Sequence, residues 1–189
     1  MAFYVCNRRW NLIVNIYKKI SKAYHGGHTD VYRLFSDKDV HSYDYSSLYP
    51  AQMFKHSMPT GKMISFTGNP LKAGDTLRSL SDQHAFIKCS VYADKSLNRP
   101  LYQTTVKIND INRSVCATGL FNNQWVYVPE LLYYEELTNG KTRIVTESIT
   151  EGYLFESKNI FKNYIKFKIR SRVIETLSVK CKFTAKPLS

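Results

Sequence analysis

The sequence has few cysteines and no long apolar run. Its four cysteines are far apart and form no Cys-x-x-Cys pair: Cys6, Cys89, Cys116 and Cys181. This spacing argues against a zinc site and suits packed thiols in a reducing compartment. Among the histidines, His25 and His28 are the only close pair, and they lack a cysteine or acid at ligand spacing. Because no apolar run approaches the roughly 20 residues that cross a bilayer, a membrane partner is not expected.

Acidic residues are scarce as well. Lys and Arg number 27 against 15 Asp and Glu, so the formal net charge is +12. This balance predicts an anionic partner, and nucleic acid is the commonest one. A basic surface kept only for solubility is the alternative. With 43% hydrophobic and 14% aromatic residues, the chain has enough apolar side chains for a core, and disorder is not expected.

The first 24 residues contain basic side chains and no acid, since the first acid is Asp30. This bias is typical of a mitochondrial transit peptide. Apolar residues also recur there at helical spacing: Trp10, Ile13, Val14, Tyr17 and Ile20. We favour a basic amphipathic helix that packs on a domain, because a cleaved leader would end too close to the segment that follows.

Residues 43–53 combine a lone acid with a proline-punctuated turn. Val40–Tyr45 is predicted to be a short buried strand with Asp44 at its end, where a carboxylate needs a cation or a donor. Ser46 and Ser47 favour a turn, and Pro50 is expected to keep Tyr49 out of a helix. A surface turn with a solvated Asp44 is the alternative, and the local chemistry leaves both open.

The remaining pattern predicts a mixture of helices and strands. In the first third of the chain we expect a strand at Thr29–Phe35, a tight turn at Ser36–Asp39, and a helical turn through Phe54 and His56 that Pro59-Thr60-Gly61 ends. The middle is expected to contain a central strand at Ala85–Tyr92, a strand at Leu101–Ile108 paired with it, and further strands at Gly119–Val128, Arg143–Val145 and Gly152–Phe155. Two helices are expected, one from Pro129 to Leu137 closed by Asn139-Gly140 and one at Lys158–Phe183 capped by Ser157.

The last of these helices is strongly basic. Glu175 is its only acid, and its apolar stripe begins with Ile160, Phe161, Tyr164 and Ile165. Such a helix is able to track phosphates by charge alone, with binding that weakens as salt rises. A solvated face is an equally good interpretation of any single lysine.

Two motifs resemble those of a known family. Asp44-x-x-Ser47-Leu48-Tyr49-Pro50 is similar to the first palm motif of family B DNA polymerases, and Ala51-Gln52-Met53 resembles its continuation in the protein-primed branch of linear mitochondrial plasmids, some bacteriophages and adenoviruses. Tyr24-His25-Gly26-Gly27 resembles the Tyr-x-Gly-Gly motif that joins the exonuclease and polymerase regions of this family and contacts DNA.

The resemblance implies an α+β fold, part of a polymerase palm with a β-rich insertion and a basic C-terminal helix. The implied segments are 1–59 with both motifs, 60–157 as the insertion, and 158–189 as the start of the fingers. Trp125, Pro129-Glu130-Leu131 and Gly152-Tyr153-Leu154-Phe155 resemble landmarks of the insertion, although Trp125, Tyr153 and Phe155 are also typical core residues.

The resemblance also implies roles for single residues. Asp44 would be catalytic and would bind two Mg²⁺ ions, with the carbonyl of Tyr45 helping to hold one. Tyr45 and Tyr49 would bind the deoxynucleotide triphosphate, with Tyr49 under the sugar. The residues implied in contact with primer-template DNA are Tyr24, Gly26, Gly27 and Ser47. A terminal priming protein would be a further partner.

Several parts of a complete enzyme are missing from the sequence. Residues 179–189 contain no Asn-Ser-x-Tyr-Gly run, no Asp-Thr-Asp follows, and no paired carboxylates of an exonuclease precede Asp30. We therefore expect a truncated fragment of a protein-primed DNA polymerase, and the frequent Tyr, Phe, Ile, Lys and Asn favour an AT-rich mitochondrial source. A DNA-binding remnant that has lost catalysis is the alternative.

Overall fold

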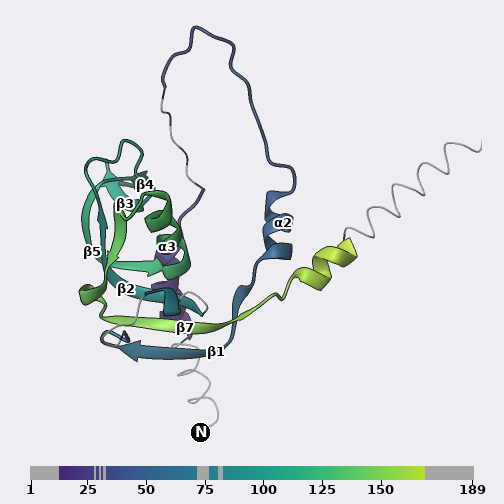
Figure 1. Cartoon of the computed structure of the whole chain (residues 1–189), viewed down its shortest axis with the longest axis vertical. Coiled ribbons are helices and arrows are strands. Elements are labelled where there is room, and N and C mark those ends of the chain that lie inside the picture. The colour runs from purple at the N-terminus through teal and green to yellow at the C-terminus, as the bar shows by residue number, and fades with distance from the viewer. Residues whose placement is uncertain are drawn as a thin grey trace, which may run out of the picture. The chain divides into compact units, whose positions relative to one another are not determined.

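The computed structural model describes residues 13–27, 29, 31, 33–71, 77–80 and 83–168 (Figure 1). These residues divide into two compact units. Unit 1 takes the described residues up to 31 together with Thr60–Glu156, and unit 2 takes Arg33–Pro59 and the described residues from Ser157 onward.

A five-stranded sheet forms the centre of unit 1. The strand order is β1 (Met58–Thr67), β7 (Glu151–Lys158), β2 (His84–Ala93) and β5 (Gly119–Tyr127), and β6 (Thr142–Val145) also pairs with β2. Strand β2 is antiparallel to β5, β6 and β7. The predicted central strand at Ala85–Tyr92 is therefore confirmed, as are the strands near 119–128, 143–145 and 152–155.

The two faces of this sheet carry different clusters, because neighbouring residues of a strand point to opposite faces. Ala85 and Ile87 of β2 and Val126 of β5 belong to the larger core, which also includes Leu131 of the helix α3 (Val128–Leu137). Phe86 of β2 and Trp125 of β5 belong to the other cluster. The sheet is thus covered on both faces, and α3 packs on the side of the larger core.

Helix α3 matches its prediction at both ends. Pro129 stands in its first turn, where the missing N–H costs no intrahelical bond. Asn139 and Gly140 follow it with φ angles of 51° and 78°, which is the left-handed conformation that closes many helices.

The second cluster is completed by the N-terminal helix. Residues 13–20 are helical and continue into a 3₁₀ turn at Ser21–Ala23. A packed helix was predicted, but its buried face differs from the expected one. Of the expected stripe, Ile20 packs on the sheet together with Ile16 and Ala23, whereas Ile13, Val14 and Tyr17 are exposed and Trp10 lies outside the described residues.

The predicted pairing of Leu101–Ile108 with the central strand is wrong. Strand β3 (Gln103–Ile108) instead pairs with β4 (Ile111–Cys116) in a separate two-stranded sheet. The neighbours of β2 are β5, β6 and β7, so both its edges are occupied. The turn residues Asn109 and Asp110 have φ angles of 49° and 63°, which suit a tight two-residue hairpin.

The predicted buried strand at Val40–Tyr45 is also wrong. These residues have no regular structure, and every one of them is exposed. The described residues of the predicted strand at Thr29–Phe35 are likewise irregular and exposed. A strand requires a hydrogen-bonded neighbour, and none of the sheets includes these residues. The predicted turn at Ser36–Asp39 is present, because the Ser36 hydroxyl bonds to the backbone of Lys38.

Helix α2 (Leu48–Lys55) contains Tyr49, contrary to the prediction from Pro50. Proline falls here in the first turn, where backbone N–H groups have no intrahelical acceptor, so the helix forms around it. Pro59 and Gly61 were expected to end a helical turn, but α2 ends at Lys55 and both residues lie in β1. Strand β1 is at the edge of the sheet, where proline is tolerated.

The C-terminal helix begins later than predicted. Ser157 and Lys158 belong to β7, so Ser157 is not an N-cap, and residues 162–168 are helical. The predicted part beyond 168 lies outside the described residues. No helix among the described residues is long and apolar enough to cross a membrane. Cys89 is buried and Cys116 half-buried, both as free thiols, and burial raises the pKa of Cys89 to about 12.

Candidate nucleic-acid interface

The predicted DNA-contact segment Tyr24–Gly27 directly follows the 3₁₀ turn at Ser21–Ala23 in unit 1. Ala23 is 4% exposed, whereas the next residue, Tyr24, is 81% exposed with extended backbone angles. The chain therefore passes within one residue from the core to solvent. An exposed tyrosine ring of this kind is a stacking surface for a base.

The backbone makes no sharp turn at the two glycines of this segment. Residues 24–27 contain no turn or bend, and neither Gly26 nor Gly27 has a positive φ angle. A Cβ atom added at either position would meet no atom within 4 Å. Packing within the chain thus does not require glycine there. A backbone that leaves room for a ligand's close approach stays a prediction.

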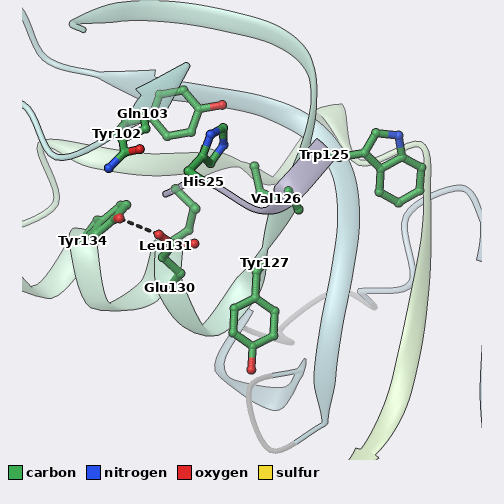
Figure 2. A pocket seen from close by; sticks show the side chains of 10 residues that line it. His25, Tyr102, Gln103, Trp125, Val126, Tyr127, Glu130, Leu131 and Tyr134 are labelled. Carbon is green, nitrogen blue, oxygen red and sulfur yellow. Dashed lines mark hydrogen bonds between the residues drawn. The ribbon is translucent and has the colours of Figure 1, made fainter. Parts of the chain in front are cut away.

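His25, the next residue of this segment, faces a pocket of unit 1. It lines a small pocket together with residues from the start of β3, from β5 and from α3 (Figure 2). These include Tyr102, Gln103, Tyr127, Glu130 and Tyr134. Since His25 is half-buried while Tyr24 is exposed, neighbouring side chains of the motif have opposite surroundings.

The tyrosines of this pocket are neutral hydrogen-bonding groups. The Tyr134 hydroxyl donates to the Glu130 carboxylate at 2.5 Å (Figure 2). Burial, followed by this bond, raises the pKa of Tyr134, and burial raises the pKa of Tyr127 to about 12. Burial likewise raises the pKa of Tyr102. All three hydroxyls remain protonated near neutral pH.

A charged cluster fixes the helix that precedes the motif. Lys19 forms an ion pair with Glu151, with 2.5 Å between Nζ and Oε2. The same Nζ lies 5.6 Å from the ring centroid of Trp125 and 5.9 Å from that of Tyr153. These two rings stack at 5.6 Å with an interplanar angle of 13°. Cations over aromatic faces are attracted by the ring quadrupole.

Sequence reasoning missed the role of Lys19 and Glu151. The hydrogen bond between them raises the pKa of Lys19 and lowers that of Glu151. The two residues are 132 positions apart, so no local pattern connects them. The prediction that Trp125 and Tyr153 are typical core residues is confirmed, since they are 6% and 9% exposed.

The residues of the first palm motif lie in unit 2. Asp44, Tyr45, Ser47 and Tyr49 are all exposed. The predicted turn is present at residues 46 and 47. Ser47 has a φ angle of 57° and makes no side-chain cap, but its carbonyl accepts the Ala51 N–H at 3.0 Å. The motif is therefore a loop that leads into α2, with Asp44 and Tyr45 before the helix and Tyr49 within it.

The start of the C-terminal helix contacts α2 inside unit 2. The Asn159 side chain donates to the Phe54 carbonyl at 3.0 Å, and Lys162 Nζ lies 5.7 Å from the Phe54 ring centroid. Carbonyls in the last turn of a helix lack intrahelical donors, so Asn159 satisfies one of them. These contacts connect α2 with Lys162 and with the start of the basic helix.

The described residues do not themselves form a metal site. Among them, no group of three His, Cys, Asp or Glu side chains could hold an ion. Asp44 is an exposed carboxylate, and a two-metal site needs further acidic ligands.

The described residues form an α+β segment of a basic chain, with exposed residues in both predicted motifs. The family described as DNA polymerase type B, organellar and viral, matches residues 11–180. The chain belongs to this family, and the predicted membership is confirmed.

Two relatives agree with this assignment. A "Probable DNA polymerase" of Ascobolus immersus is 37% identical over 146 residues, which are 77% of this chain and 11% of the relative. A "Probable DNA polymerase" of Neurospora intermedia is 28% identical over 176 residues, or 87% of this chain and 17% of the relative. This chain thus spans less than a fifth of either relative.

Among solved structures, "Phi29 DNA Polymerase, orthorhombic crystal form" has a TM-score of 0.50 and 22% identity to this chain. The match covers 80% of this chain and 26% of the polymerase. The similarity shows the fold, and the predicted α+β class is confirmed.

Proposed function

We propose that this chain is the part of a type B DNA polymerase that supplies the first palm acid and a DNA-contact segment for nucleotidyl transfer in DNA replication. The observation that carries the proposal is the exposure of the motif side chains. Asp44 and Tyr45 lie on the loop before α2, Tyr49 lies on α2, and Tyr24 follows a buried residue, all accessible to a ligand.

We assign a role to each of these groups. Asp44 is the catalytic acid and binds Mg²⁺ together with the Tyr45 carbonyl, in a site that needs carboxylates from outside the described residues. Tyr45 and Tyr49 bind the deoxynucleotide triphosphate. In the proposed complex, primer-template DNA is contacted by Tyr24, Gly26, Gly27 and Ser47.

We also propose how replication is primed and from which replicon the chain comes. Residues 60–157 are the β-rich insertion between palm motifs, and a terminal protein supplies the priming hydroxyl. We propose a mitochondrial plasmid as the source. The organellar and viral scope of the family and the net charge of +12 support this setting.

A DNA-binding remnant without catalysis is the second candidate. It is favoured by the lack of a metal cluster among the described residues, while the basic side chains and the exposed Tyr24 ring are retained. The two candidates differ in whether Asp44 matters, because a remnant binds DNA without using this carboxylate.

Primer extension with Mg²⁺ separates the candidates. Extension that disappears in Asp44→Ala and persists in Asp39→Ala, a nearby exposed acid outside the motif, would establish the catalytic role of Asp44. Salt-sensitive DNA binding without extension, unchanged in Asp44→Ala, would establish the remnant. Failure to bind a labelled primer-template at low salt would contradict both.

The DNA-contact segment has its own test in the same system. Tyr24→Ala is expected to weaken binding by about 1–3 kcal/mol, because stacking on one base is lost. Tyr133→Ala is the matched control, since Tyr133 is an exposed tyrosine of unit 1 on α3. Fluorescence anisotropy of the labelled primer-template measures both. Equal affinities of the two variants would remove Tyr24 from the interface.

A further inference from the structure

Lys19 occupies an unusual position for a lysine of this basic chain. Its ammonium is held by Glu151 and lies over the stacked rings of Trp125 and Tyr153. Glu151 is also approached by Lys88, with 3.6 Å between Lys88 Nζ and Oε1. The charge of Lys19 is therefore compensated inside unit 1, which makes a phosphate contact a poor use of it.

Lys19 lies a few residues before Tyr24 in the chain, so its contacts can fix the backbone that carries Tyr24. Lys19 stands one residue before Ile20, and Ile20 and Ala23 belong to the same hydrophobic cluster as the two rings. The backbone then passes directly to Tyr24, whose N–H still donates to the Ser21 carbonyl at 3.2 Å. An ion pair and two apolar contacts thus fix the turn from which the Tyr24 ring projects into solvent.

We propose that Lys19 is a positioning residue, whose pairing with Glu151 on the Trp125–Tyr153 stack holds the segment that presents Tyr24 to DNA. This inference rests on the proposed function of Tyr24. A held ring loses less conformational freedom when it stacks on a base, so the ion pair increases DNA affinity without contacting DNA.

The direction in which Glu151→Gln changes DNA affinity separates a positioning role of Lys19 from a direct contact with DNA. Replacing an acid near bound DNA by its amide ordinarily strengthens binding, because a repulsive charge is removed and Lys19 is released toward phosphates. Positioning predicts the opposite. Glu151→Gln is expected to weaken primer-template binding about 2- to 5-fold, in the range of a partly exposed salt bridge. Glu136→Gln, an exposed acid on α3, is expected to bind as tightly as the unaltered chain or more tightly.

The salt dependence gives an independent measurement. Lys19→Met is expected to weaken binding by the same factor while the slope of log affinity against log salt stays unchanged. Loss of a phosphate contact would instead reduce that slope by about 0.7–0.9. Lys19→Arg keeps a cation that stacks on aromatic rings, and it is expected to restore the affinity.

A double-mutant cycle with Tyr24→Ala decides whether the effect passes through this ring. If Glu151 acts by holding Tyr24, then Glu151→Gln has no further effect on affinity once Tyr24 is alanine. Effects that simply add would overturn the inference, as would a slope reduced by Lys19→Met or tighter binding by Glu151→Gln. Hydrogen exchange of residues 20–24 is expected to accelerate in both single variants and to recover in Lys19→Arg.

The outcomes also separate this inference from the function on which it rests. If Tyr24→Ala binds DNA normally, the role of Tyr24 fails and the positioning role of Lys19 fails with it. If Tyr24→Ala weakens binding but Glu151→Gln and Lys19→Met do not, only the positioning role is overturned. Thermal unfolding confirms that each variant is folded, and if Glu151→Gln does not fold, Lys19→Met decides, since the Lys19 side chain is 40% exposed.

Discussion

Glu151 is the acid on which two lysines of unit 1 converge. Lys19 and Lys88 approach its two carboxylate oxygens at 2.5 and 3.6 Å. The hydrogen bond from Lys19 holds the pKa of Glu151 below its usual value, and the same bond holds the pKa of Lys19 above its usual value. Both partners of the pair are therefore charged across the neutral range.

The stability of the chain should depend on pH through this pair. Because the folded-state pKa of Glu151 is lowered, its contribution is fully present above the unfolded value of 4.5 and is lost as pH falls through the folded value. The Lys19 contribution is present below 10.5 and is lost as pH rises through its raised pKa. At pH 7 we expect Glu151→Gln to lower the free energy of unfolding by about 0.5–1 kcal/mol, a partly exposed pair being worth no more.

Urea denaturation over a range of pH measures this contribution. The difference between the unaltered chain and Glu151→Gln should shrink as pH falls below 4.5. Glu136→Gln serves as the control for loss of an exposed acid on the same unit. A difference that persists undiminished in acid would mean that Glu151 stabilises the fold by packing and not by charge.

For single residues, the sequence predicts the motif residues but not the residues that pack around them and hold them. Asp44, Tyr49 and Tyr24 were predicted as site residues because each stands in a short run of fixed spacing, and their roles stay predictions. The partner of Lys19 is 132 positions away and becomes a neighbour only after β7 and the N-terminal helix have packed. A buried setting was expected for Asp44, but neither burial nor partners could be read from one carboxylate.

Among the elements, β7 depends on a glycine for its place in the sheet. A Cβ added at Gly152 would lie 2.4 Å from Phe66 Cζ and 2.7 Å from the Phe86 carbonyl oxygen. Phe66 belongs to β1 and Phe86 to β2, the two strands that flank β7. The carbonyl is part of the ladder and cannot rotate away, so the strand itself would have to shift.

Gly152→Ala is therefore expected to lower the free energy of unfolding by about 1–3 kcal/mol, the usual cost of overpacking. Gly26→Ala is the matched control, because a Cβ there meets no atom within 4 Å. Urea denaturation of both variants measures the difference. Equal stabilities would show that β1 and β7 move apart at little cost.

Elements with strong local signals were predicted correctly. The apolar run of β2 and the Pro129 and Asn139-Gly140 ends of α3 carry enough information by themselves. The predictions were wrong where a residue or strand far away in the sequence determines whether a segment forms a strand and with which strand it pairs. Val40–Tyr45 has a strand-like composition but no neighbouring strand among the described residues, and Leu101–Ile108 pairs with its own hairpin because β2 is already occupied on both sides.

For the whole molecule, charge is the dominant property, with a formal net charge of +12. Residues 158–168 contain four lysines and no acid. Lys166 is exposed on the helical residues 162–168. Because a lysine that contacts phosphate releases a counterion, Lys166→Gln is expected to reduce the salt slope of DNA affinity by about 0.7–0.9.

Anisotropy titrations at several salt concentrations test this prediction. Tyr24→Ala is the comparison, because loss of stacking should lower affinity at every salt concentration and leave the slope unchanged. A slope that Lys166→Gln does not alter would place this lysine on a solvated face, which is the alternative that the sequence left open.

Strand β1 pairs with β7 near the two ends of residues 60–156, which bears on whether this segment could be moved into another protein. A Cβ added at Gly61 would lie 2.5 Å from Glu156 Oε2, so residues 60 and 156 leave unit 1 at one place. Just beyond them, the Ser57 and Ser157 hydroxyls are hydrogen-bonded at 2.6 Å. Segments whose ends meet are the ones that tolerate transplantation. A transplanted 60–156 segment would need the N-terminal helix with it, because Ile16, Ile20 and Ala23 complete its second cluster.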